Sequence, residues 1–364
     1  MRNNNIYFIL LCLVASCLEV KAQSGSTQSF SYLRRPANAR VLGIGGENIT
    51  VMDKDVSMAI YNPALITSDL HTSFSINYQP YLANINATNI AYGHTFKKLG
   101  TLVASLQYMS YGEMDNTDAT GQVLGTFSPS EYAFAVGTSR TQGVFSFGGN
   151  LKFAGSNISG YSSYALLADL GGTFKHPKKD MSVGMLIKNA GFTFSDYTKS
   201  SNSTLPFDVQ LGLSYKLEHM PLRVSVTAVK LYKYDIRYDD PNKPLPLDLN
   251  GDPIPESNTG FDKIMRQTDI VFRHLVFGGE FLMSKNINLR VGYNHMLRRE
   301  MQVEEIFSMA GFSFGGMIRI AGFEFAYSRT NYHIAGGLNT LSLSTNFMNT
   351  FKKKAVAAPV PVAN

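Results

Sequence analysis

The clearest catalytic pattern in this 364-residue chain is Gly311-Phe312-Ser313-Phe314-Gly315. Gly-x-Ser-x-Gly is the pattern of a nucleophile elbow, in which a sharp turn from a strand into a helix exposes the serine hydroxyl. Here apolar and polar residues alternate around Ser313, and no helical pattern follows. The segment therefore predicts an ordinary strand in which Ser313 points inward, rather than a catalytic serine.

The segment from Asp248 to Asp252 places carboxylate and amide oxygens at alternate residues, as a calcium-binding loop does. Its glycine comes too early for an EF-hand, so an Asx-type turn is the simpler interpretation and a weak calcium site the alternative. The seven histidines include no close ligand pair, and Gly43, Gly45 and Gly46 lack the Lys-Ser/Thr of a phosphate loop. We therefore expect no enzyme, no metal site and no cofactor.

Most of the chain after Ser73 alternates apolar with polar residues. In residues 205–217, for example, one face carries Val209, Leu211 and Leu213, and the other carries Asp208 and Gln210. Such alternation is typical of strands with one apolar face. About fourteen strands can be counted in this way, and a barrel of that size encloses more space than apolar side chains can fill.

We therefore predict an all-β fold, a transmembrane barrel of about 14 antiparallel strands over residues 71–350, with its apolar faces toward lipid. A two-sheet sandwich or several small β domains would also fit the alternation. Short and long connections alternate between the strands, as in membrane barrels that have short periplasmic turns and longer outer loops. An even strand count would return both termini to the periplasm.

The longest connection, residues 235–268, is expected on the extracellular side. Loops of this length are usually functional or disordered. We interpret it as a loop that docks a basic partner surface, with a merely solvated loop or a lid over the barrel mouth as alternatives. The residues that we assign to docking are Asp239, Asp240, Pro241, Asp248, Asp252 and Glu256.

Residues 1–22 have the pattern of a secretory signal peptide, with Arg2, an apolar run and Ala22 before the expected cut. Lipoprotein cleavage at Cys17 is the alternative. Charged residues make up 16% of the chain, against about a quarter in soluble domains. Lysine and arginine are scattered, so no nucleic-acid partner is expected. Residues 351–364 have no strand pattern and are interpreted as a flexible periplasmic tail.

Residues 23–70 follow neither a strand nor a helix period. We interpret them as a periplasmic segment and a hatch, around which the barrel closes. Residues 33–65 should fill the lumen, Gly45 or Gly46 should adopt a conformation that other residues resist, and Pro63 should end a local turn. The motif residues are Arg35, Pro36, Arg40, Gly43, Gly45, Gly46, Asn62, Pro63 and Ala64.

In order and spacing, these motifs resemble the hatch of the FadL-like outer-membrane barrels. Within that superfamily, they are most similar to the barrels of the Bacteroidetes type IX secretion system. The resemblance implies an outer-membrane barrel of a Gram-negative bacterium, in a membrane that contains lipopolysaccharide. It further implies that the barrel anchors a PorZ-like surface protein in the attachment complex, beside PorU- and PorV-like components.

The FadL resemblance implies an alternative function, a channel for hydrophobic small molecules. A lipid-modifying enzyme is a third hypothesis, for which the residues offer no convincing site.

Overall fold

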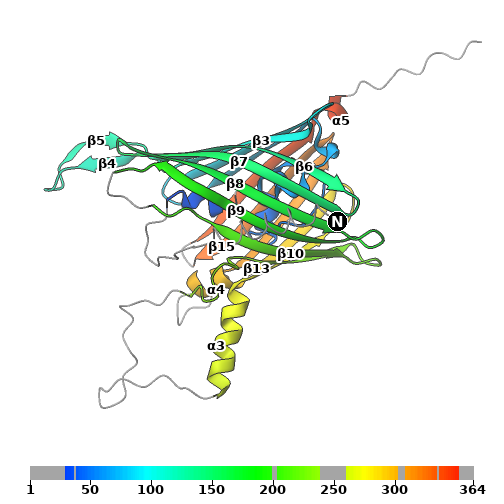
Figure 1. Ribbon diagram of the computed structural model, residues 1–364. Coiled ribbons are helices and arrows are strands. Elements are labelled where there is room, and N and C mark those ends of the chain that lie inside the picture. The colour runs from blue at the N-terminus through cyan, green and yellow to red at the C-terminus, as the bar shows by residue number, and fades with distance from the viewer. Residues whose placement is uncertain are drawn as a thin grey trace, which may run out of the picture.

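The computed structural model describes residues 29–36, 38–198, 203–237, 260–301, 308–333 and 336–351. Fourteen of its strands form one closed barrel in which every neighbouring pair is antiparallel (Figure 1). This confirms the predicted fold and excludes the sandwich alternative. The barrel strands are β1 Ser73–Pro80, β2 Asn86–Phe96, β3 Gly100–Ser110, β6 Ser130–Gln142, β7 Phe145–Ile158, β8 Tyr161–Lys175, β9 Met181–Ser195, β10 Asp208–Lys216, β11 Leu222–Ala228, β12 Leu275–Phe281, β13 Ile287–Asn294, β14 Phe312–Ile320, β15 Phe323–His333 and β16 Gly336–Asn346.

The two faces of the wall differ as the alternation predicts. In β10, Asp208 and Gln210 are buried toward the lumen, whereas Leu211 and Leu213 are 46% and 42% exposed on the outside. Large apolar side chains are exposed in the same way on the other barrel strands. An apolar outer band and a polar interior are what a barrel in lipid requires, because the outer side chains meet acyl chains.

Secondary structure extends into several of the expected long connections. The hairpin of β4 (Met114–Thr117) and β5 (Val123–Phe127) projects from one end of the barrel (Figure 1). The helix α3 (Gly260–Arg273) occupies the end of the expected connection 235–268, where no helix was predicted from the sequence. α4 (His295–Met301) begins directly after β13. None of the described helices is long and apolar enough to cross a membrane.

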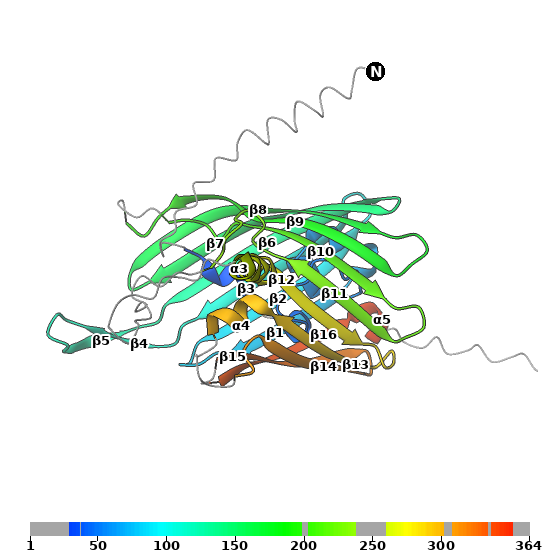
Figure 2. The same cartoon turned by 90° about the horizontal axis from the view of Figure 1, so that it is seen from below.

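The lumen is filled by short helices that precede β1: η1 Ser31–Arg34, α2 Ala39–Gly43, η2 Val56–Ile60, η3 Pro63–Leu65 and η4 Ser68–Leu70 (Figure 2). We call residues 29–70 the hatch. Polar residues start three of these helices: Asn38 accepts from the backbone of Arg40 and Val41, Asp55 from Ser57, and Asn62 from Ala64. Pro63 stands at the first position of η3, so the expectation that it ends a turn is wrong.

The described chain begins and ends at opposite ends of the barrel. The Ser29 amide donates to the Thr204 carbonyl at the end with the long connections, whereas the Phe347 amide donates to Thr72 at the end with the short turns. The sequence predicts a periplasmic position for both termini. The termini themselves, with the predicted signal peptide and residues 352–364 of the predicted tail, lie outside the described residues.

The Leu211→Arg substitution tests the orientation of the wall. It places a charge on the lipid face near the middle of β10, which should lower the free energy of unfolding by about 2–4 kcal/mol. Phe281→Arg is the matched control, because Phe281 is also exposed but ends β12 at the rim, where the cost is about 0–1 kcal/mol. Denaturant titration of the two variants in vesicles measures the difference. Equal costs would mean that the lipid band lies elsewhere.

Candidate functional site at the contact between hatch and wall

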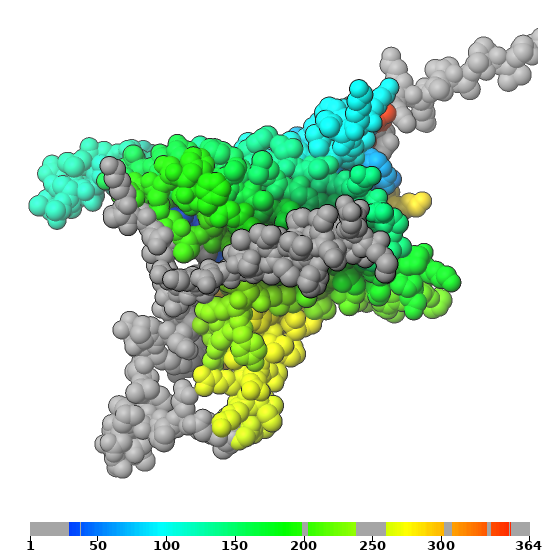
Figure 3. All heavy atoms as spheres, in the orientation of Figure 1, coloured from blue at the N-terminus to red at the C-terminus, as the bar shows by residue number. Residues whose placement is uncertain are grey.

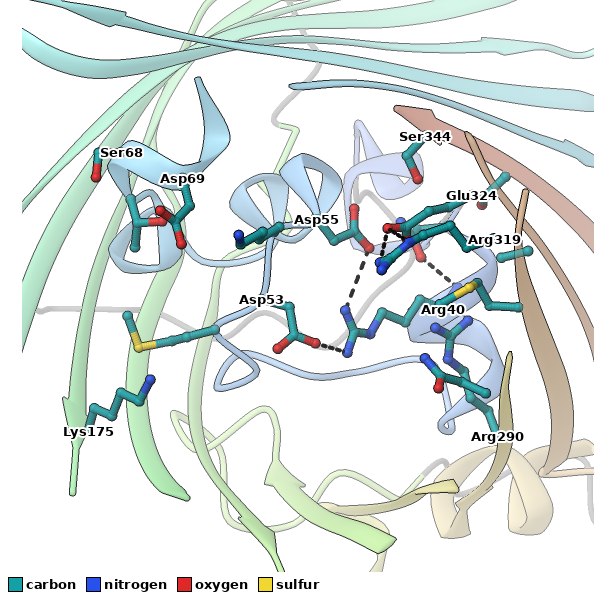
Figure 4. Close-up of a pocket in the computed structure, with 18 residues that line it drawn as sticks. Arg40, Asp53, Asp55, Ser68, Asp69, Lys175, Arg290, Arg319, Glu324 and Ser344 are labelled. Atoms are coloured by element: carbon teal, nitrogen blue, oxygen red, sulfur yellow. Dashed lines mark hydrogen bonds and ion pairs between the residues drawn. The ribbon is translucent and has the colours of Figure 1, made fainter. Parts of the chain in front are cut away.

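A buried network of ion pairs joins the hatch to three adjacent wall strands. Arg40 Nε of the hatch donates to Glu280 Oε1 of β12 at 3.0 Å, and Arg40 also pairs with Asp53 of the hatch. Arg223 of β11 lies 2.9 Å from Glu280 Oε2 and 3.1 Å from Asp53 Oδ2, and Arg290 of β13 lies 3.2 Å from Glu280 Oε1. Figure 4 shows the Arg40 side chain pointing into a cavity toward Asp53 and Asp55.

The charges of this network depend on one another. Burial alone opposes ionisation of Asp53, but Arg40 and Arg223 outweigh it and hold the pKa of that carboxyl well below its usual range. Burial likewise disfavours the charged form of Arg40, yet Glu280 and Asp53 raise its pKa well above the usual value. Removing one partner of a buried ion pair leaves an uncompensated charge, which costs far more than losing a surface pair. The network therefore ties α2, whose backbone lies against β13–β16, to β11–β13 as well.

Glycines allow the hatch backbone to approach the same part of the wall. A Cβ added at Gly292 of β13 would lie 2.0 Å from the Gly45 nitrogen, and one added at Gly43 would lie 3.4 Å from the Gly315 Cα of β14. Gly45 and Gly46 have φ values of 103° and 98°, a region that side chains disfavour. Gly315 of the Gly-x-Ser-x-Gly segment thus allows the hatch backbone at Gly43 to pack closely on β14.

The Asn-Pro-Ala motif makes a second close contact, on the opposite side of the lumen. The Asn62 amide donates to the Ile49 carbonyl at 2.7 Å inside the hatch. A Cβ at Gly171 of β8 would lie 1.9 Å from Asn62 Oδ1, and one at Gly148 of β7 would lie 2.4 Å from the Pro63 carbonyl carbon. The Asn-Pro-Ala motif therefore packs closely against β7 and β8.

The structure thus divides the motif residues into three groups. Arg40, Gly43 and Gly45 lie against β12–β14, with Gly46 directly after them, and Asn62, Pro63 and Ala64 lie against β7 and β8. Arg35 is exposed near the long connections, 5.6 Å from the ring centre of Tyr81, and Pro36 lines a cavity there. All residues assigned to the docking loop, from Asp239 to Glu256, lie outside the described residues.

Sequence reasoning missed the wall partners Glu280 and Arg223. Each is a charged residue at an inward position of an alternating strand, which is the signal that could have indicated them. A second buried ion pair was also missed. The Lys152 amine of β7 lies 2.6 Å from the Asp169 carboxylate of β8 and donates to Asn189 Oδ1 at 3.0 Å. In the network of Glu280 and in the pair of Lys152 with Asp169, each buried charge lies beside a partner of opposite charge.

The hatch divides the lumen into two compartments. At the short-turn end, a polar cavity of about 510 Å³ is lined by Arg40, Asp53 and Arg290 (Figure 4). At the long-connection end, a cavity of about 310 Å³ is lined by Leu42, Gly46 and Glu47. Because residues on either side of α2 line different cavities, α2 forms part of the partition between them.

The second cavity contains charged groups beside apolar ones. Lys188 and Lys230 face it together with Leu42, Val229 and Leu297. Burial raises the pKa of Glu47 to about 7, although the nearby Lys188 opposes this rise.

No catalytic constellation is evident around Ser313. This serine is buried in β14, which continues as a strand to Ile320, and no hydrogen bond to its hydroxyl is found among the described residues. Within the described ranges, no group of three or more histidine, cysteine, aspartate or glutamate residues could hold a metal ion. The Asp248–Asp252 segment lies outside them.

Comparison with known proteins adds the fold class. No family model and no curated protein matches this chain. The fold is similar to that of the TodX deltaS2S3 mutant monoaromatic hydrocarbon channel, with a TM-score of 0.52 at 11% identity, over 86% of this chain and 99% of that one. Weaker likenesses include the Ralstonia pickettii toluene transporter TbuX (TM-score 0.46, 9% identity, 86% and 99% covered) and a Pseudomonas aeruginosa FadL homologue (0.42, 11%, 85% and 98%).

The chain therefore shares the fold of TodX, and its closed barrel has a hatch inside it. At these identities the likeness concerns the fold alone.

The Arg40→Ala substitution tests the ion network. It leaves Glu280 paired with Arg223 and Arg290, and Asp53 paired with Arg223. The loss of the charged hydrogen bonds of Arg40 should weaken the contact between hatch and wall by about 1.5–3 kcal/mol. Open events should then appear in planar-bilayer recordings. Arg319→Ala is the control, because Arg319 pairs with Glu324 at an exposed position. Equal conductance traces for the two variants would show that Arg40 does not hold the hatch.

A pH dependence follows from Glu47. Its pKa rises from an ordinary 4.5 to about 7 in the folded chain, so the folded hatch binds more protons than the unfolded one between these values. The stability of the hatch should therefore fall as pH rises through this window and then stay constant. Hydrogen exchange of residues 38–53, corrected for intrinsic rates, measures this. In Glu47→Gln the stability of the hatch should depend less on pH. An unchanged pH dependence would show that another group causes it.

Proposed function

We propose that this chain is a non-enzymatic outer-membrane barrel whose lumen stays filled and which anchors a protein at the cell surface. The contact of Arg40 with Glu280, beside the close packing of Gly43 on Gly315, is the observation that carries this proposal. A hatch held by buried charges and by backbone packing is costly to move. Such a barrel suits a fixed structural role better than repeated opening.

The partners are inferred from the motif resemblance. The hatch motif, from Arg35 to Ala64, resembles that of the PorQ barrels of the type IX secretion system. On this basis the partner is a PorZ-like surface protein, in an attachment complex with PorU- and PorV-like components that processes secreted cargo. The host would be a member of the Bacteroidetes. Residues 235–268 are the proposed docking segment, because their prolines restrict the free loop and their carboxylates suit a basic surface.

A second candidate function is a channel for hydrophobic or amphiphilic small molecules. The cavity of about 310 Å³ at the long-connection end favours it, because Lys188 and Lys230 could meet an anionic head while Leu42 and Val229 meet an apolar tail. TodX, whose fold this chain shares, is described as a monoaromatic hydrocarbon channel. Transport through the barrel would require α2 to leave the wall, so this function needs a moving hatch.

Replacing residues 241–258 with a short Gly-Ser linker tests the anchoring function. The barrel should still assemble, because these residues lie outside its strands. The surface protein should be lost from complexes purified in mild detergent, and cargo attachment should fall. The matched control replaces the β4–β5 hairpin tip, residues 118–122, with the same linker and should retain the partner.

Two outcomes would contradict anchoring. If the partner stays bound and conductance rises, residues 241–258 form a lid instead. If the purified wild-type barrel carries a fatty acid and no protein partner, and Lys188→Gln with Lys230→Gln releases that fatty acid, the channel function is the correct one.

A further inference from the structure

The helix α3 has one apolar face that is exposed along its whole length. Its large apolar side chains recur at helical spacing, so they share one side. Phe261, Ile264 and Met265 are 70%, 63% and 55% exposed, and Val271 and Phe272 are also exposed. Single exposed apolar residues are common, but a contiguous apolar stripe on a folded chain marks a surface that something covers.

The C-terminal part of α3 is held to the protein by charge. Asp269 pairs with Arg299 and His295 of α4 at 3.0 and 3.1 Å, and with Arg273 of α3 at 2.8 Å. Ile270, on the side of the helix opposite the apolar face, is buried. The C-terminal part of α3 therefore packs on the protein, whereas both the apolar face and the polar residues Lys263, Arg266 and Gln267 are exposed along the rest of the helix. An exposed apolar face is the reverse of an ordinary surface helix in water.

The apolar face of α3 continues the lipid-facing surface of the wall. The ring centres of Phe272 in α3 and Phe277 in β12 lie 6.3 Å apart. Phe277 has the same parity in β12 as the exposed Phe281, so it points outward toward lipid. Apolar surface thus extends without a break from the outer wall onto the helix.

The direction of α3 fits this continuity. In Figure 1 it runs across the direction of the barrel and away from the wall, near the end with the long connections. In Figure 2 it is seen along its own axis and falls within the outline of the barrel rather than beyond its end. Figure 3 shows it standing out from the barrel surface. A helix placed in this way runs roughly parallel to the plane of the membrane.

We propose that α3 lies in the outer interface of the membrane, with Phe261, Ile264, Met265 and Phe272 among the acyl chains beside the barrel. Lys263 and the rest of the polar face then point to water and headgroups. Interfacial helices bind lipid in this manner, through an apolar face on one side and charged residues on the other. This inference concerns how the barrel sits in lipid and does not rest on the proposed anchoring function, but it confines the proposed docking segment to residues 235–259.

The chain contains no tryptophan, so one introduced indole reports its own surroundings. Met265→Trp places it on the apolar face, and Lys263→Trp places it almost opposite, one turn or less away. Both variants, and Leu211→Trp on the lipid face of β10, are reconstituted as full chains in phosphatidylcholine vesicles with brominated acyl chains. Heat-modifiable mobility in electrophoresis verifies that each barrel has folded.

The expected result is that brominated lipid quenches the emission of Met265→Trp and Leu211→Trp, while acrylamide in the water quenches Lys263→Trp. Equal acrylamide quenching of Met265→Trp and Lys263→Trp, with no effect of bromine on either, overturns the proposal. So does a result in which the indole of Met265→Trp is shielded only when a surface protein is added, because the apolar face then belongs to a protein partner.

Discussion

The contact of Arg40 with Glu280 determines how the hatch and the wall fit together. A barrel of fourteen strands has a lumen too wide for its own side chains to fill, so it holds either water or a separate segment. In this chain the hatch occupies it. That segment brings backbone and charge into a confined space, where an unpaired charge is costly. Glu280 accepts from Arg40, Arg223 and Arg290, and it thereby ties one hatch helix to three neighbouring strands. The two lumen compartments, and the position of Gly43 on Gly315, follow from this attachment.

The sequence alone predicted the wall better than the contents of the lumen. The alternation of apolar and polar residues along β10 assigned Leu211 to the lipid face and Asp208 to the lumen. This was possible because alternation is a local property of the chain. The positive φ of Gly45 and Gly46 was also predictable from residue type. The pairing of Arg40 with Glu280 was not, since 240 residues separate them and no local pattern links the two.

The helices were missed for a related reason. α3 follows a proline-rich connection, and its helical period covers a single short segment in a chain otherwise dominated by alternation. Pro63 was assigned to the end of a turn, whereas it begins a helix, because a proline is compatible with either position. The serine motif was interpreted correctly as part of a strand. Gly311 and Gly315 match a catalytic pattern, but Gly315 lies against the hatch backbone at Gly43.

The position of the hatch also bears on the order of assembly. The hatch precedes β1 in the chain, and the barrel closes where β1 pairs with β16, between the first and last strands. Chains rarely thread through closed loops. A hatch that fits glycine against glycine and buries its charges is therefore easier to enclose than to insert afterwards. The seam of β1 and β16 then becomes the last to form, so the nascent sheet must remain open until its C-terminal strand has been made.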